Sequence, residues 1–451
     1  MTTQEQSQQP QGFMRWLKES VTVKLGFIAV LILVLLIPQA LVDGLINERA
    51  NRQEEAIKKV SDQFSGDQLV QGPVLVIPYR EQTTETDDKG KKSTGEAIEN
   101  LFILPNELHF RGNVNTEILY RGIYKVPVYT SSLNVSGNFT KADLSSISVD
   151  PTKLMPEKAY LVFSISDLKG LKTNPQVSIA GQTLAATPIA GEGLFPNGLQ
   201  VPVNLYNKYD GPISFSFNLD LKGSQELHFL HLGKTTDVEL KGNWPDPSFD
   251  GRFLPDTRVV NQEGFRAKWR MLYYNRPFPQ QWVHDIGLIS NSKKTDDAIF
   301  GLKLMLPIDQ YQQTTRTSKY AILIILLTFV SLFFTEMIGK QRVHAFNYIL
   351  IGAAMVIYYT LLLSFSEQIG YNWAYLVASG ATVMLIAVFL ASVLKNRKAA
   401  SIFAFILSLF YAFIYVIIQL EDLALLIGSI ALFVIIAALM YSSRKINWDK
   451  H

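Results

Sequence analysis

Six stretches of this 451-residue chain are long and apolar enough to cross a lipid bilayer, and this feature limits the possible folds more than any other. A helix of about 20 residues, rising 1.5 Å per residue, spans a hydrocarbon core of roughly 30 Å. The stretches run approximately from Leu25 to Val42, Tyr320 to Gly339, Ala345 to Phe365, Asn372 to Leu394, Ala400 to Leu420 and Leu423 to Tyr441. The sequence therefore predicts one N-terminal membrane helix and a C-terminal bundle of membrane helices.

The short segments beside these spans carry positive charge on alternate sides of the bilayer. The basic flanking residues are Arg15, Lys18, Lys24, Lys340, Arg342, Lys395, Arg397, Lys398, Arg444, Lys445 and Lys450. The opposite connections, residues 366–371 and 421–422, contain no Lys or Arg. Because segments rich in Lys and Arg stay in the cytoplasm, we expect both termini to be cytoplasmic.

This orientation predicts five successive parts of the chain. They are a cytoplasmic tail at residues 1–24, a transmembrane signal anchor at 25–42, an extracytoplasmic domain at 43–319, five transmembrane helices at 320–441 and a cytoplasmic tail at 442–451. We expect the anchor to stay uncleaved, because its apolar core is long, Pro38 interrupts it and no clear small-x-small cleavage site follows.

The extracytoplasmic segment is almost electrically neutral, with 31 basic and 32 acidic residues between Asp43 and Lys319. A nucleic-acid-binding face needs a clustered basic excess, so the charge balance argues against binding to nucleic acid. The chain contains no cysteine, which excludes disulfides, thiolate metal sites and cysteine nucleophiles.

The segment after the anchor first has helical and then strand-like periodicity. Ile57, Val60 and Phe64 share one helical face, so we expect the anchor to continue as a stalk until Ser65-Gly66. From Leu69 onward apolar residues alternate with polar ones, most clearly between Ile213 and Leu221. This period predicts a mainly antiparallel β domain, either a sandwich or a pair of linked sheets.

Other runs refine the predicted β domain. Further strands are expected at Val74–Tyr79, Leu101–Leu104, Lys125–Tyr129, Leu133–Phe139 and Leu161–Ile165. Pro78 and Pro127 indicate strand ends or sheet edges, since proline has no N–H to donate. The segment from Glu81 to Ala97 is nearly devoid of apolar residues and is predicted to be a mobile hairpin tip.

Several longer motifs resemble those of one known family. They are Gly242–Gly251 (GNWPDPSFDG), Gly264–Trp269 (GFRAKW), Asp309–Gln312 leading to Lys319–Leu323, Leu361–Gly370, Arg121–Tyr124, and Gly72-Pro73 with Ile77–Tyr79. This pattern resembles the CreD family of cell-envelope-integrity inner-membrane proteins over nearly the whole chain. Two positions depart from it: Asp246 stands where the family often has His, and Ala345 where it often has Pro.

The resemblance implies a multi-pass protein of the bacterial inner membrane with residues 43–319 in the periplasm. It also implies a role in envelope maintenance or the envelope stress response, with no established biochemical activity and no cofactor. The departure at Asp246 removes support for a catalytic histidine at that position.

A candidate partner-binding site lies in the proline-rich motif. Its residues are Trp244, Pro245, Pro247, Ser248 and Phe249. Two prolines would hold the aromatic side chains in a stiff, extended loop that could grip a periplasmic protein or a glycolipid. The alternative is that the aromatic residues form a packing corner of the β domain.

The histidines support no metal or catalytic site. Glu226, His228 and His231 are the group to consider, and a β-bulge between the histidines would bring both to the solvent-exposed face. No third convergent ligand is evident, and a zinc site needs three or four. His109 and His284 are interpreted as hydrogen-bonded structural residues, and no hydrolase, metalloprotease or nucleotide-binding motif is present.

The membrane spans contain few ionisable residues but several polar ones. Glu336 is expected to form an ion pair with Lys340 at the end of its helix, and the lack of charge near the midplane argues against coupled transport. A candidate outer-leaflet groove comprises Tyr358, Tyr359, Ser364, Tyr411, Tyr415 and Gln419, near Thr360. The alternative is interhelical hydrogen bonding combined with an aromatic belt that includes Tyr371, Trp373 and Tyr375.

Three functional hypotheses follow. The preferred one is a non-enzymatic envelope-integrity protein whose outer domain binds an envelope component or a partner protein. The second is a membrane protein that handles a lipid or another small molecule through the outer-leaflet groove. The third is a membrane-tethered hydrolase of envelope polymers.

Overall fold

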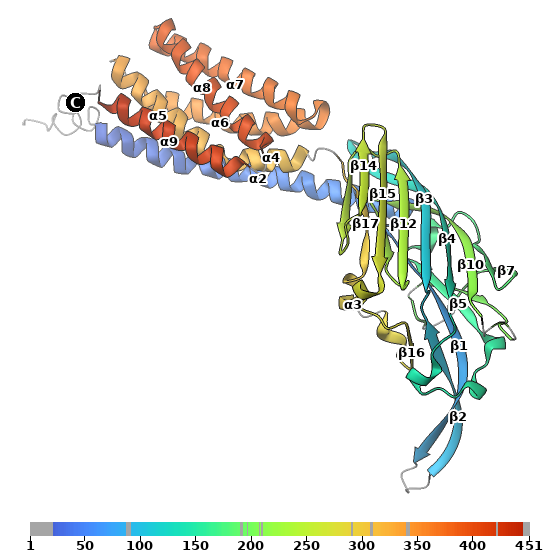
Figure 1. The fold of residues 1–451 in the computed structure, drawn as a ribbon. Helices are drawn as coiled ribbons and strands as arrows, with labels where there is room; N and C mark the ends of the chain where they lie inside the picture. The colour runs from blue at the N-terminus through green and yellow to red at the C-terminus, as the bar shows by residue number, and fades with distance from the viewer. Residues whose placement is uncertain are drawn as a thin grey trace, which may run out of the picture. The chain divides into compact units, whose positions relative to one another are not determined.

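The computed structural model describes residues 21–86, 92–189, 193–195, 197–206, 208, 211–289, 292–306, 310–339, 343–420 and 423–444. The chain divides into two compact units, which are shown in Figure 1. The membrane unit comprises Met1–Gln53 and Ile308–His451, and the β unit comprises Glu54–Pro307.

Among the described residues, six helices are long and apolar enough to cross a bilayer, as the hydropathy pattern predicts. They are α2 (Val21–Phe64), α5 (Ala321–Gly339), α6 (Ala345–Ile369), α7 (Tyr371–Leu394), α8 (Arg397–Gln419) and α9 (Ala424–Ser443). Polar side chains cap two of the helices: His344 accepts a hydrogen bond from the Phe346 N–H at the start of α6, and Asn396 accepts from Lys398 and Ala399 at the start of α8. These bonds satisfy backbone donors that the helices themselves leave unpaired.

Glu336 forms an ion pair with a partner that the sequence analysis did not anticipate. Its side chain is buried, and its carboxylate binds the Lys24 ammonium group and accepts a hydrogen bond of 3.1 Å from the Tyr348 hydroxyl. The expected partner, Lys340, lies outside the described residues. A buried carboxylate requires an opposite charge and further hydrogen bonds, and here α2 and α6 supply both.

The β unit begins with the end of α2, which continues past the apolar segment as the predicted stalk and ends at Phe64. Val60 packs with Val126 and Val128, and Ile57, Phe64 and Leu119 surround this small cluster. The Ser61 and Ser224 hydroxyls are also hydrogen-bonded, at 2.7 Å. The helical face recognised in the sequence is therefore the face that contacts the sheet.

Two sheets make up the body of the β unit. The nine-stranded sheet contains β1 (Gln68–Thr86), β2 (Lys92–Ile103), β5 (Tyr160–Ile165), β8 (Thr187–Pro188), β9 (Gly198–Pro202), β11 (Glu226–Leu230), β13 (Pro247–Gly251), β16 (Gln281–Val283) and β17 (Ile299–Leu304). The eight-stranded sheet contains β3 (Glu107–Arg121), β4 (Tyr124–Phe139), β6 (Gln176–Ile179), β7 (Gln182–Ala185), β10 (Ile213–Ser224), β12 (Thr235–Gly242), β14 (Thr257–Asn261) and β15 (Gly264–Leu272).

The strand order follows β13-β17-β11-β1-β5-β9-β8 in the first sheet, where β2 pairs with β1 and β16 beside this path. The second sheet has the order β14-β15-β12-β3-β4-β10-β6-β7. Pairing is antiparallel except between β1 and β11 and between β12 and β3. The predicted mainly antiparallel architecture is confirmed.

One hydrophobic core lies between the two sheets, which identifies the unit as a β-sandwich. The ring centroids of Phe110 and Phe229, which come from different sheets, are 4.9 Å apart. Those of Phe163 and Phe217 are 4.7 Å apart and the rings are stacked. The apolar residues that alternate along β10 all point into this core, as their period of two requires.

Short helices connect the strands. They are the α-helix α3 (Ser292–Asp296) and the 3-10 helices η1 (Leu144–Ile147), η2 (Pro151–Lys153), η3 (Pro156–Lys158), η4 (Leu168–Gly170), η5 (Tyr273–Asn275) and η6 (Ile286–Leu288). A further helix, α4 (Gln310–Lys319), belongs to the membrane unit and precedes α5.

The segment predicted to be a hairpin tip is mostly strand. β1 and β2 pair continuously out to Thr86 and Lys92, and they project beyond the other strands (Figure 1). Only residues 87–91 of the expected tip lie outside the described residues. The predicted hairpin is present, and its strands extend further than expected because a projecting two-stranded ribbon has no core to face and so needs no apolar alternation.

Pro78 and Pro127 are not at strand ends, since β1 and β4 continue past them. Each proline lies where the strand loses its second neighbour: the β1–β5 ladder stops at Val76 and the β4–β10 ladder at Val128. A residue without an N–H is tolerated there because no ladder partner requires it.

Candidate functional site

An open groove of about 680 Å³ lies between α7 and α8 in the membrane unit. Its lining residues are Asn372, Tyr375, Leu376, Ser379, Gly380, Val383, Met384, Ala387, Ala404, Ser408, Tyr411, Ala412 and Tyr415. The groove is hollow because both helices present small side chains there. Gly380, Ala404 and Ala412 fill little of the space between neighbouring ridges.

One end of the groove is polar. The side-chain oxygen Oδ1 of Asn372 accepts hydrogen bonds from the side-chain amide of Gln419 at 2.7 Å and from the Tyr415 hydroxyl at 3.3 Å. Asn372 lies in the first turn of α7, and Gln419 is the last residue of α8. The groove therefore combines an apolar length with a group of amide and hydroxyl side chains at one end.

A tyrosine cluster lies beside the groove. Its members are Tyr358 and Tyr359 on α6, Tyr371 and Tyr375 on α7, and Tyr411 and Tyr415 on α8. Tyr358 is at the centre, with ring centroids 4.8 Å from Tyr359 and from Tyr411 and 6.0 Å from Tyr375, all edge to face. Edge-to-face contacts of this kind add stability beyond the area they bury.

Three hydroxyl groups in the tyrosine cluster lack a hydrogen-bond partner among the described residues. They belong to Tyr358, Tyr359 and Tyr411, and all three side chains are buried. Tyr375 differs, because its hydroxyl donates to the Tyr411 backbone carbonyl at 2.7 Å. An unpaired buried hydroxyl costs about 1–3 kcal/mol, so packing alone would favour phenylalanine at these positions.

The six residues predicted for the groove occupy three different environments. Tyr411 and Tyr415 line it, and Gln419 binds its lining residue Asn372. Tyr358 and Tyr359 lie in the tyrosine cluster and not on the groove wall, whereas Ser364, like Thr360, is exposed elsewhere on α6.

Only part of the aromatic belt predicted at Tyr371, Trp373 and Tyr375 lies on the surface. The Trp373 side chain is exposed, but Tyr371 and Tyr375 are buried in the tyrosine cluster. Their offset of four residues places Tyr371 and Tyr375 on one helical face, which turns away from the face of Trp373.

The polar helix α4 was not recognised in the sequence, because it has no apolar stripe. Its Tyr311 hydroxyl donates to the Glu367 carboxylate at 3.0 Å, and Arg49 lies 3.8 Å from the same carboxylate. Thr317 is hydrogen-bonded to the Tyr371 hydroxyl at 2.7 Å. Tyr311 and Glu367 both belong to motifs that carry the family resemblance. These motifs are the sequence feature from which a contact between the two residues could have been expected.

A second polar contact fixes α4 to the first membrane helix. The Ser318 hydroxyl is hydrogen-bonded to the Asp43 carboxylate and accepts a hydrogen bond from the Gln39 amide at 2.9 Å. Gln39 and Ser318 are both buried. Together with Arg49 and Glu367, these residues form a polar group at one end of the membrane unit.

The proline-rich motif lies in the β unit and is engaged in packing. The Trp244 side chain is only 7% exposed, and its indole N–H donates to the Met305 carbonyl at 3.0 Å. Phe249 is half-buried and contacts Phe265 and Trp269 edge to face. Pro247, Ser248 and Phe249 belong to the edge strand β13, while Pro245 precedes it.

The predicted β-bulge between His228 and His231 is absent. β11 pairs with β17 in continuous register and ends at Leu230, and His231 is fully buried. Its Nε2–H donates to the Leu272 carbonyl at 3.2 Å, and its Nδ1 accepts from the Thr236 hydroxyl at 2.9 Å. The apolar pattern changes phase here because β11 ends at Leu230 and His231, the next residue, is buried.

His228 remains partly accessible but does not complete a metal site with Glu226. Its Nε2 lies 2.7 Å from the Asp250 carboxylate, whereas its Nδ1 lies 3.6 Å from Glu226. The two carboxylates thus face different ring nitrogens. The Lys303 ammonium group lies 2.8 Å from the Glu226 carboxylate and neutralises its negative charge.

Comparison with known proteins confirms the family resemblance. Residues 20–449 match the family model described as Inner membrane protein CreD. The chain is also 31% identical over 418 residues to a protein named Inner membrane protein CreD from Escherichia coli strain K12. That alignment covers 92% of this chain and 91% of the relative.

Replacing an unpaired tyrosine should cost no stability. We expect Tyr359→Phe to leave the free energy of unfolding in detergent, measured by thermal denaturation, unchanged or to raise it by up to about 1–3 kcal/mol, since no hydrogen bond is lost. Tyr348→Phe is the matched control. It removes the bond to the buried Glu336 and should destabilise the protein by about 1–3 kcal/mol. Equal destabilisation by both variants would contradict the assignment of an unpaired hydroxyl at Tyr359.

The buried His231 should make stability depend on pH. Burial lowers the pKa of His231 from 6.5 to about 4, so its contribution is complete above pH 6.5 and is lost as pH falls towards 4. The full loss is about 3 kcal/mol. Urea denaturation of wild type and His231→Gln at a series of pH values tests this, because the difference between the two profiles isolates the histidine. A variant that loses stability as steeply as wild type between pH 6.5 and 4 would refute the prediction.

Proposed function

This chain belongs to the CreD family of inner membrane proteins, and on that basis we propose that it supports cell-envelope integrity without catalysis, by binding a phospholipid in the groove between α7 and α8. The observation that supports the proposal is the groove itself, which is apolar along its length and polar at the end near Asn372. This proposal combines the envelope role expected from the family with the lipid-handling hypothesis.

The dimensions and chemistry of the groove support a lipid as its occupant. A hollow lined by Gly380, Ala404 and Ala412 in a membrane helix pair leaves these side chains without packing partners unless an acyl chain enters. Bulk lipid tails are as apolar as the groove, so shape and polar contacts must provide the preference for one lipid. The Asn372 amide N–H groups and the nearby Gln419 are suitable donors for ester or phosphate oxygens.

The proposal includes the orientation derived from the charged flanks. With both termini in the cytoplasm, the β unit is periplasmic and the polar end at Asn372 lies in the outer leaflet. Lys24 near the start of α2 and the basic segment 395–398 between α7 and α8 both support this orientation.

The two other hypotheses receive less support from the geometry. Binding of an envelope partner through Trp244 and Phe249 would require side chains that are now packed or half-buried to be available. A hydrolase would need an accessible nucleophile beside a base, whereas the hydrogen-bonded pair of His231 and Thr236 is fully buried. A non-enzymatic role is therefore the one we propose.

Filling the groove should displace the lipid. We expect Gly380→Leu combined with Ser408→Leu to reduce the phospholipid that copurifies in detergent, measured by extraction and mass spectrometry, at least about tenfold, which corresponds to roughly 1.4 kcal/mol of binding free energy. The same variant should fail to restore envelope integrity to cells that lack the gene.

The matched control is Ala381→Leu, which adds bulk to the neighbouring exposed position of α7 outside the groove. It should retain both the lipid and the cellular activity. If the groove-filled variant is produced at normal levels and behaves like the control in both assays, the proposed lipid-binding role is wrong.

A reporter enzyme that is active only outside the cytoplasm tests the orientation. We expect activity when it is inserted in the exposed 3-10 helix η1 at Ser145-Ser146 of the β unit and none when it follows His451. The reason is that the positively charged flanks hold alternate helix ends in the cytoplasm. The opposite pattern would reverse the topology and place the polar end of the groove in the inner leaflet.

A further inference from the structure

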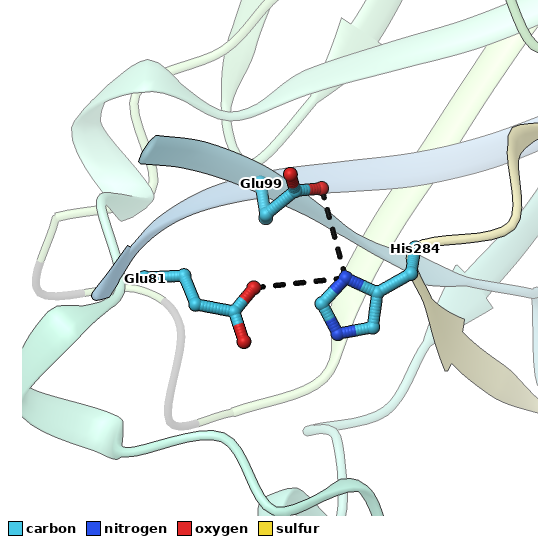
Figure 2. A group of neighbouring side chains, drawn as sticks. All are labelled: Glu81, Glu99 and His284. Carbon is cyan, nitrogen blue, oxygen red and sulfur yellow. Dashed lines mark ion pairs between the residues drawn. The ribbon is translucent and has the colours of Figure 1, made fainter. Parts of the chain in front are cut away.

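Three potential metal ligands from distant parts of the chain meet on the β1–β2 hairpin. Figure 2 shows the Glu81 and Glu99 carboxylates pointing towards the imidazole of His284. One ligand atom from each residue lies within 4.8 Å of the other two. Glu81 and Glu99 are half-buried and His284 is exposed, so ions from solvent can reach the group.

The strand register accounts for this convergence. Tyr79 pairs with Glu99 and Glu81 pairs with Ala97, so the two glutamates are diagonal neighbours on the same face of the hairpin. β16 pairs with β2 up to Leu101, and His284 follows its last residue, Val283. The stacked rings of Phe102 and Trp282, with centroids 5.2 Å apart, hold this segment against β2.

The interatomic distances suit a bound cation better than a hydrogen-bonded cluster. The Nδ1 atom of His284 lies 3.6 Å from the Glu81 carboxylate and 3.7 Å from the Glu99 carboxylate. Both distances exceed those of ordinary hydrogen bonds. Two ligands of a tetrahedral zinc ion at about 2.0–2.1 Å are separated by roughly 3.4 Å, so a small contraction would place Nδ1 and each carboxylate at the spacing of two zinc ligands.

Tyr79 provides the outer partner that a metal-binding histidine usually has. Its hydroxyl lies 3.5 Å from Nε2 of His284, and its ring is edge-on to the imidazole. When Nε2–H donates to this oxygen, the lone pair of Nδ1 faces the two carboxylates.

We propose that Glu81, Glu99 and His284 bind one divalent transition-metal ion of the zinc type, with water completing its coordination. Mixed imidazole and carboxylate ligands are typical for zinc. The ion would connect both strands of the projecting hairpin to the segment after β16. The alternative is that a protonated His284 merely neutralises the two glutamates, in which case no metal is required.

Isothermal titration with ZnCl2 distinguishes these accounts. The full-length protein is purified in detergent without a polyhistidine tag, treated with EDTA and exchanged into metal-free buffer at pH 7. We expect one zinc ion to bind per chain, and Glu99→Gln and His284→Asn each to weaken binding more than about tenfold. Asparagine suits position 284 because the backbone there has a φ of 64°. Tyr79→Phe should weaken binding about 10- to 100-fold by releasing the imidazole.

Glu96→Gln is the matched control, since Glu96 lies on the same strand but on the opposite face and its replacement removes the same charge. It should bind zinc as wild type does. Absence of binding by wild type, or equal affinity of the Glu99→Gln, His284→Asn and Glu96→Gln variants, would overturn the proposal. X-ray absorption of the zinc-loaded wild-type protein gives a second test that needs no variant. One imidazole with oxygen ligands supports the site, and a spectrum without imidazole refutes it.

Discussion

The hydrocarbon interior of a bilayer accepts almost no unpaired polar groups, and the organisation of this chain depends on that constraint. Its spanning segments are helices, whose backbone groups bond within the segment. Several polar side chains between the helices are paired: Glu336 with Lys24 and Tyr348, and Glu367 with Tyr311 and Arg49. The short helix α4 contributes to these pairs although it is too polar to span a membrane.

The tyrosine cluster departs from this pairing, as the buried Thr328 hydroxyl also does. Its central hydroxyls have no partner among the described residues, although neighbouring Tyr371 and Tyr375 do. Polar groups retained in a membrane interior without a structural partner are commonly associated with function. Their position beside a groove with a polar end at Asn372 links them to the lipid-binding role proposed above.

The β unit follows a different physical logic, because water can satisfy any backbone group at its surface. Its stability comes from the apolar core between two sheets, within which His231 is tolerated because both ring nitrogens are hydrogen-bonded. Beyond Tyr79 on β1 and Leu101 on β2, which still belong to this core, the β1–β2 hairpin is stabilised mainly by its own ladder. A metal ion at Glu81, Glu99 and His284 would strengthen the hairpin where the core provides no support.

Local patterns in the sequence determined the spanning helices and the general architecture, although they missed the polar helix α4. The six spanning helices, the stalk that ends at Phe64 and the strand from Ile213 could all be predicted, because hydrophobic period and length are properties of neighbouring residues. Two sites of interest were also recognised as groups of residue types: the polar residues of α6 and α8, and the proline-rich motif. Which of those residues share an environment could not be read from the same patterns.

Only the tertiary structure decided which side chains meet. Tyr411 and Tyr415 line the groove, whereas Tyr358 and Tyr359 do not. His231 is buried, and Glu336 pairs with Lys24, which is 312 positions away in the sequence. The tertiary structure also brought His284 to Glu81 and Glu99 through the register of three strands. The physical reason is that period specifies which face a residue occupies, whereas strand register and helix packing specify what that face contacts.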